Sequence, residues 1–116
     1  MFQKKQQDPD FRYFTILDTK TNSYRDPVQA VNHLDLIRQL EALMTDPERQ
    51  KDLYVSNAED FQLFEIGSYS RKTGLIEAQQ PKHVINLIEI KTSATHRIMQ
   101  QLPQMPKEET RLTPVQ

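Results

Sequence analysis

The run Asp60–Tyr69 and the turn after it constrain the fold of this chain more than any other stretch. Apolar and aromatic residues fill most of this run, which breaks at the Gly-ended turn Ser70–Gly74 and resumes as an apolar run from Leu75. Two such runs around a short turn are typical of a β-hairpin. Gly74 stands where the turn needs a left-handed residue, and Gly67 lies inside the first strand, where glycine marks a bulge or a close backbone approach. We therefore predict a long hairpin centred on this turn.

The residues before the hairpin predict a strand, an edge strand and a helix. Phe11–Leu17 is rich in aromatic and β-branched residues and favours a strand, and Asn22 suits a left-handed position in the turn that follows. Tyr24–Val28 contains a proline, which restricts it to a short edge strand. Apolar residues at spacings of three and four predict a helix over residues 33–44, capped by Asn32.

The segment after the hairpin is ambiguous. Residues 82–90 fit a helix that begins at Pro81, whereas Ile88–Ile90 alternates like a strand, and we expect a helical start with an extended end. From Thr92 on, proline-, glutamine- and charge-rich sequence indicates a flexible tail. Within that tail, His96–Leu102 has the pattern of a transient helix that folds onto a partner.

These elements predict one small α+β domain. We expect a three- to four-stranded, mostly antiparallel sheet with one main helix on one face. The domain covers residues 11–91, between a flexible N-terminal arm (1–10) and a flexible C-terminal tail (92–116). Hydrophobic residues make up 36% of the chain, below the roughly 45–50% of typical globular domains. Such a thin core favours a homo-oligomer or a protein partner.

Composition excludes several functional classes. The chain has no Cys, which fits an intracellular protein, and neither an apolar run of membrane-spanning length nor an N-terminal signal segment. The net charge of −1 provides no overall attraction to nucleic acid. His33, His83 and His96 lie in three separate segments, so no metal site is expected. Without a Gly-rich phosphate loop or a nucleophile motif, we predict no cofactor and no enzyme.

The predicted sheet offers two apolar faces, because side chains alternate along a strand. On the first strand, Phe14 and Ile16 lie with Arg12, opposite Phe11, Tyr13 and Leu17. On the second, Phe64 and Ile66 lie opposite Phe61, Leu63 and Tyr69, although a bulge at Gly67 would move Tyr69. One face is aliphatic enough to receive the helix, and the other is more aromatic.

Two interpretations of the aromatic face remain open. In the first, residues 84–90 or a second subunit bury it as ordinary core. In the second, its aromatic side chains stack on bases while basic loop residues hold phosphates, as in sequence-tolerant single-strand binders. The second interpretation predicts the following nucleic-acid-binding residues: Arg12, Tyr13, Lys20, Arg25, Phe61, Tyr69, Arg71 and Lys72.

The hairpin phrase also resembles a known family. Asp60 to Tyr69 follows the pattern Asp-aromatic-x-Leu-aromatic-x-Ile-Gly-x-Tyr, and a turn ending in Thr73-Gly74 comes after it. This resembles the small nonstructural protein, of the fifth-open-reading-frame type, of gokushovirus-like Microviridae, which are tailless single-stranded-DNA bacteriophages. The strand, turn, proline and helix upstream match the same layout, so the resemblance covers roughly residues 11–91.

The resemblance implies a phage protein made in the host bacterial cytoplasm and absent from the virion. It implies a role in binding single-stranded DNA, or in the switch from duplex replication to single-strand synthesis and packaging. It supplies no binding residues. We therefore expect a non-enzymatic accessory protein that binds single-stranded DNA weakly. The alternative is a protein–protein adaptor that docks the replication initiator, a host factor or the procapsid through its aromatic face and tail.

Overall fold

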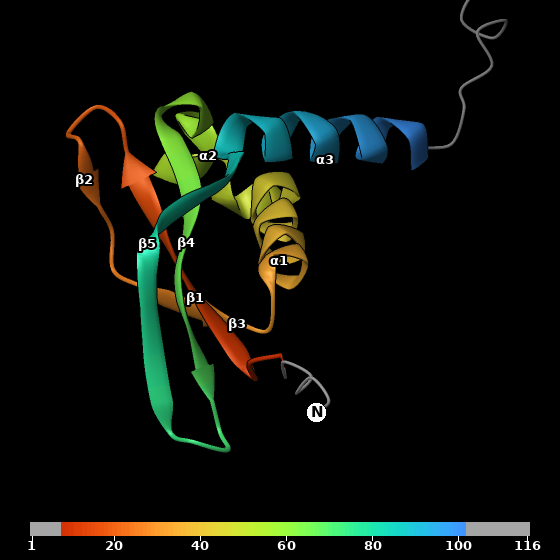
Figure 1. Cartoon of the computed structure of the whole chain (residues 1–116). Coiled ribbons are helices and arrows are strands. Elements are labelled where there is room, and N and C mark those ends of the chain that lie inside the picture. The colour runs from red at the N-terminus through yellow and green to blue at the C-terminus, as the bar shows by residue number, and fades with distance from the viewer. Residues whose placement is uncertain (1–7, 102–116) are drawn as a thin grey trace, which may run out of the picture.

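The computed structural model describes residues 8–101, which form a curved antiparallel sheet with α1 and α3 packed against one side (Figure 1). The predicted α+β class, with a small antiparallel sheet, is confirmed. The elements are β1 (Phe11–Asp18), β2 (Ser23–Tyr24), β3 (Val28–Ala30), α1 (His33–Thr45), a 3-10 turn (Pro47–Arg49), α2 (Leu53–Ser56), a second 3-10 turn (Ala58–Asp60), β4 (Phe61–Ser70), β5 (Leu75–Asn86) and α3 (Leu87–Gln101).

Strands β1 and β4 form the centre of the sheet. The strand order is β2-β1-β4-β5, and β3 also pairs with β1. All four pairings are antiparallel. The predicted edge strand over residues 24–28 is in fact two short strands, with Pro27 between them. Proline has no N–H to give to a ladder, so the pairing is interrupted there.

Both glycines take the roles predicted for them. Gly74 has φ +72° and donates its N–H to the Ser70 carbonyl at 2.8 Å, which closes the β4–β5 turn. At Gly67, a Cβ atom would lie 2.7 Å from the backbone oxygen of Glu77, and the register with β1 shifts beside it. Asn22 has φ 57°, as expected for its turn. These backbone positions were therefore correctly predicted from residue type.

The main helix also has its predicted limits. Asn32 Oδ1 accepts the Asp35 N–H at 2.8 Å, which caps α1, and the helix ends before Pro47. The core lies between α1, α3 and the β1–β4 pair, and its largest fully buried side chains are Phe14, Val55, Phe61, Leu63, Leu87 and Ile90. The helix-covered face of β4 thus carries Phe61 and Leu63.

The order predicted for residues 82–90, a helical start followed by an extended end, was wrong. Residues 82–86 are extended, and all of them except Val84 pair with β4; the helix begins only at Leu87 and continues to Gln101. The chain is helical from Leu87 because Leu87, Ile90 and Ala94 recur at spacings of three and four and all become buried. The tail predicted from Thr92 therefore begins inside α3, with residues 92–101 helical. The rest of that tail, and most of the predicted N-terminal arm, lie outside the described residues.

Candidate binding face

The sheet face opposite α1 and α3 gathers most of the described rings that are not fully buried. Phe14 on β1 points into the core, so the residues next to it in the sequence, and every second residue from those, point to the other side. The cross-strand register extends this side to the neighbouring strands. Figure 1 shows α1 and α3 on the other side of the sheet. We call this surface the open sheet face, and its residues are Phe11, Tyr13, Leu17, Tyr24, Phe64, Tyr69, Ile76 and His83.

At one end of this face, three rings form a row across the strands. The Phe64 ring meets the Tyr24 ring edge-on at 5.7 Å and the His83 ring edge-on at 5.5 Å, centroid to centroid. Tyr24 is 49% exposed, and His83 is also exposed. His83 Nε2 lies 2.8 Å from Asn86 Oδ1, which fixes the orientation of the imidazole. We call Tyr24, Phe64 and His83 the aromatic row.

Alternation along the sequence did not predict the aromatic row. Straight alternation places Phe64 on the opposite side of the sheet from Tyr69, unless a bulge at Gly67 moves Tyr69, which was the stated alternative. The irregularity at Gly67 brings the two onto the same face, because Tyr69 pairs with Phe11 while Phe64 pairs with Thr15. The bulge predicted at Gly67 accounts for this, since a bulge reverses the alternation of every residue beyond it.

A second cluster lies at the hairpin end of the same face. The rings of Phe11 and Tyr69 stack with centroids 6.4 Å apart, and the Arg71 guanidinium carbon lies 4.7 Å from the centre of the Phe11 ring. The backbone N–H of Arg71 donates to Asp10 Oδ2 at 2.6 Å. Tyr13 is the next open-face residue along β1, and its partner Gly67 has no side chain to cover it. We call Phe11, Tyr69 and Arg71 the hairpin-end cluster.

The reverse side of the hairpin carries a polar cleft of about 510 Å³, lined by Asp8, Pro9, Arg12, Ser68, Ser70, Lys72, Thr73, Leu75 and Glu77. Arg12 Nη1 lies 3.1 Å from Glu65 Oε2 in a half-buried ion pair. Lys72 is exposed. The hairpin therefore carries cationic groups on both sides, Arg71 over the open face and Lys72 beside the cleft.

Three predicted binding residues lie elsewhere. Phe61 is 2% exposed and packs against Tyr54, so it presents no ring to a ligand. The guanidinium carbon of Arg25 lies 5.8 Å from the Phe61 ring centre, and Arg25 Nη2 forms an ion pair with Asp18 Oδ2 at 3.6 Å. Lys20 Nζ lies 3.9 Å from Asp60 Oδ2. All three sit at the β1–β2 end of the sheet, away from the hairpin.

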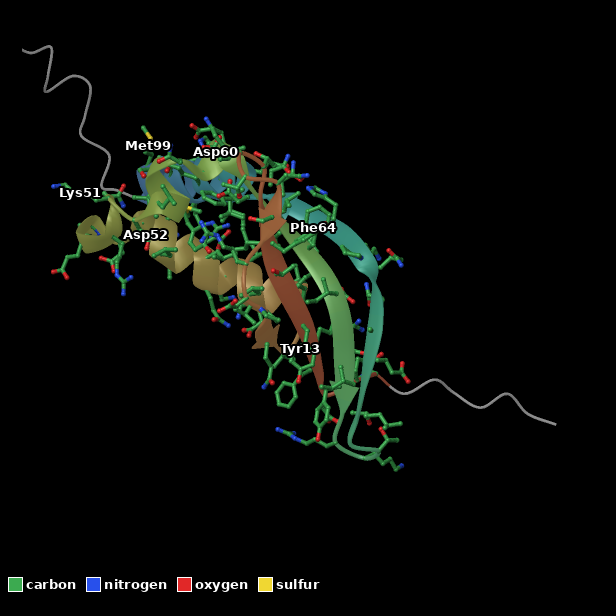
Figure 2. The ribbon with its side chains drawn as sticks, turned by 90° about the vertical axis from the view of Figure 1, so that its left-hand side faces the viewer. Tyr13, Lys51, Asp52, Asp60, Phe64 and Met99 are labelled. Carbon is green, nitrogen blue, oxygen red and sulfur yellow. The ribbon has the colours of Figure 1, made fainter. Side chains whose placement is uncertain are left out.

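The structure thus assembles five of the eight predicted residues at one end of the molecule. Tyr13, Tyr69 and Arg71 gather at the open face, while Arg12 and Lys72 lie on the cleft side of the same hairpin. Figure 2 shows Tyr13 and Phe64 on the strands, with Lys51 and Met99 in the helical part.

Within residues 8–101, no group of three or more His, Cys, Asp or Glu side chains is arranged to hold a metal ion. The same residues contain no helix with the length and apolar character needed to cross a membrane. The surface that they do present is a mixed aromatic and cationic one.

No curated protein and no solved structure matches this chain. Residues 11–90, which include the whole of the sheet, match the family described as Phage ORF5 protein. That match covers well over half of the chain and agrees with the resemblance carried by the hairpin. The chain belongs to the Phage ORF5 protein family.

Proposed function

We propose that this phage protein binds single-stranded DNA weakly on its open sheet face. It would act without catalysis in the host bacterial cytoplasm, as an accessory protein in the DNA replication or packaging of a gokushovirus-like member of the Microviridae. Family membership supports the phage origin. The observation that carries the binding proposal is the pair of ring clusters on one helix-free face, with Arg71 over one of them.

Stacking on the partly exposed rings of the open sheet face favours single strands. Each base stacked on an aromatic side chain contributes roughly 1–3 kcal/mol in single-strand binders, whatever its sequence. A duplex keeps its bases stacked inside, so flat rings on an open sheet gain little from it. The two ring clusters therefore support an extended single strand as the ligand.

The spacing of the two clusters fits one ligand strand. Phe64 pairs with Thr15 and Tyr69 pairs with Phe11, so the clusters are four β1 residues apart. At about 3.3 Å per residue this is about 13 Å along the sheet. A strand of a few nucleotides spans that length and contacts both clusters.

Few cations are available for phosphates. Arg12, Arg25 and Lys20 already lie beside carboxylates, which leaves Arg71 over the open face and Lys72 on the cleft side of the same hairpin, where it can contribute at most one further contact. Two phosphate contacts give a slope of about −1.4 in log K against log salt for a single strand. We therefore expect weak binding with a shallow salt dependence.

Fluorescence anisotropy of a labelled single-stranded oligonucleotide, at low and physiological salt, tests the proposal. Tyr69→Ala, Phe64→Ala and Arg71→Ala should each weaken binding. Lys51→Ala removes an exposed charge in the helical part (Figure 2) and should not. A flat titration of the wild-type protein at low salt would contradict the proposal.

A second candidate function, a protein–protein adaptor, is favoured by α3. Ile88 is 36% exposed and Met99 is 64% exposed. Both border a shallow apolar hollow along the helix, together with Thr92 and His96. Such a stripe suits a phage or host protein such as the replication initiator or a procapsid component. Two results together would support this alternative. The wild-type protein would not bind DNA, and it would pull down a partner from infected cells that Met99→Asp fails to pull down.

A further inference from the structure

Strand β5 is an unprotected edge of the sheet. It pairs with β4 on one side only, and residues 75–83 are all exposed. Leu75 and Ile76 are 60% and 65% exposed. An edge strand presents unpaired N–H and C=O groups and is a template for another strand, especially where its side chains are apolar.

The middle of β5 is irregular. The register with β4 passes from Ala78 to Lys82 and leaves residues 79–81 without a partner in that ladder. Pro81 has no N–H to donate to either side. Proline and irregular pairing weaken an edge locally, so any added strand must draw its pairing from the residues on either side of this segment.

The residues that flank this segment can pair with the same residues of a second copy that runs in the opposite direction. We propose that two copies of this chain pair along β5 in antiparallel orientation, about a two-fold axis between Gln79 and Gln80. In this register Glu77 lies opposite Lys82 of the second copy, and the symmetry makes this ion pair twice. Ile76 lies opposite His83, and Leu75 lies opposite Val84.

In this register, the residues that oppose one another lie on the same face of the sheet. Directly opposed residues in an antiparallel pair share a face. Ile76 and His83 both lie on the open sheet face, by their pairing with Tyr69 and Phe64. Glu77 and Lys82 pair with Ser68 and Glu65, which lie on the other face.

Charge selects this register over its neighbours. A shift of two residues keeps the faces matched but places Glu77 opposite Gln80 or Val84, and both ion pairs are lost. Opposite charges directly across a ladder stabilise it and like charges destabilise it. The dimer would join two sheets into one and make the two open faces continuous. It stands independently of the DNA-binding proposal.

Charge reversal tests the dimer through its symmetry. Glu77→Lys places two ammonium groups together twice, and Lys82→Glu places two carboxylates together twice, so each variant alone should raise the dimer Kd by about tenfold or more. An equimolar mixture of the two variants restores attractive pairing in the mixed dimer. Light scattering after gel filtration, over a concentration series, should therefore show dimers for the wild type and for the mixture. Each variant alone should show a smaller fraction of dimer at the same concentration.

Lys51→Glu is the matched control, because it reverses an exposed charge outside β5 and should leave the dimer intact. Circular dichroism checks that each variant is folded. A wild-type chain that stays monomeric across the series would overturn the proposal, and would mean that Pro81 and the irregular segment protect the edge. A dimer that neither reversal weakens, or a mixture that does not restore it, would overturn the register.

Discussion

Arg97 on α3 forms a bidentate ion pair with Glu41 on α1, with Nη1–Oε1 at 2.8 Å and Nη2–Oε2 at 3.0 Å. The hydrogen bonds from Arg97 lower the pKa of Glu41, and the same bonds raise the pKa of Arg97. This pair joins the main helix to residues that the composition assigns to a tail. Together with the burial of Leu87, Ile90 and Ala94 on α3, it makes this helix part of the domain.

The Glu41–Arg97 pair predicts a pH-dependent contribution to stability. The pKa of Glu41 is depressed below its ordinary 4.5, so the carboxylate stabilises the fold above that pH. This contribution is lost as pH falls through the lower folded pKa. Arg97→Gln should lower the melting temperature by about 1–4 °C at pH 7. The difference from wild type should vanish in acid, and a difference that persisted unchanged at about pH 2 would contradict this origin.

The burial of Ala94 predicts a large effect of charge inside residues 92–101. Ala94 is 3% exposed, whereas the adjacent Thr95 is exposed. Ala94→Asp buries a carboxylate without a partner and should destabilise the domain by about 3 kcal/mol or more, while Thr95→Asp should cost under about 0.5 kcal/mol. Urea unfolding of both variants measures the contrast. Equal stabilities would mean that α3 does not pack on the core beyond Lys91.

The two phenylalanines of β4 differ in burial, so we expect one substitution to affect mainly stability and the other mainly DNA binding. Phe61 is buried, and Phe61→Ala should destabilise by about 3–5 kcal/mol through loss of packing and the cavity left behind. Phe64 is half-buried in the aromatic row, so Phe64→Ala should cost about 1 kcal/mol. Urea unfolding and DNA titration of the same two proteins separate stability from binding. A larger stability loss at Phe64 would reverse the assignment of the two faces.

Local backbone chemistry was predictable from the sequence. Asn32, Asn22 and Gly74 each have a side chain, or lack one, that suits a single backbone role, and each takes that role. The hairpin followed from alternation around a Gly-ended turn. What alternation could not predict was the face reached after Gly67, because a bulge moves all later residues to the other face and its position depends on the partner strand.

The order of strand and helix after the hairpin depended on tertiary contacts. Residues 82–86 gain ladder partners on β4, and that gain is absent from any local pattern. One local signal was nevertheless present, because Glu89 Oε2 accepts the Asn86 N–H at 3.3 Å. Asn86 with Glu89 three residues later has the spacing of a capping box, and the Glu89 side chain supplies one of the two hydrogen bonds of that motif at the start of the helix.

The two glycines predict different costs for the same substitution. A Cβ at Gly67 would lie 2.7 Å from the Glu77 backbone oxygen, so Gly67→Ala forces the β4–β5 pair apart. We expect a loss of about 2–3 kcal/mol there. Gly74 has open space around it but φ +72°, so Gly74→Ala should cost about 1–2 kcal/mol, and Gly74→Asn less, because asparagine tolerates the left-handed region. Thermal unfolding of the three variants gives the order. If Gly67→Ala cost no more than Gly74→Asn, steric contact with Glu77 would not be what requires glycine at position 67.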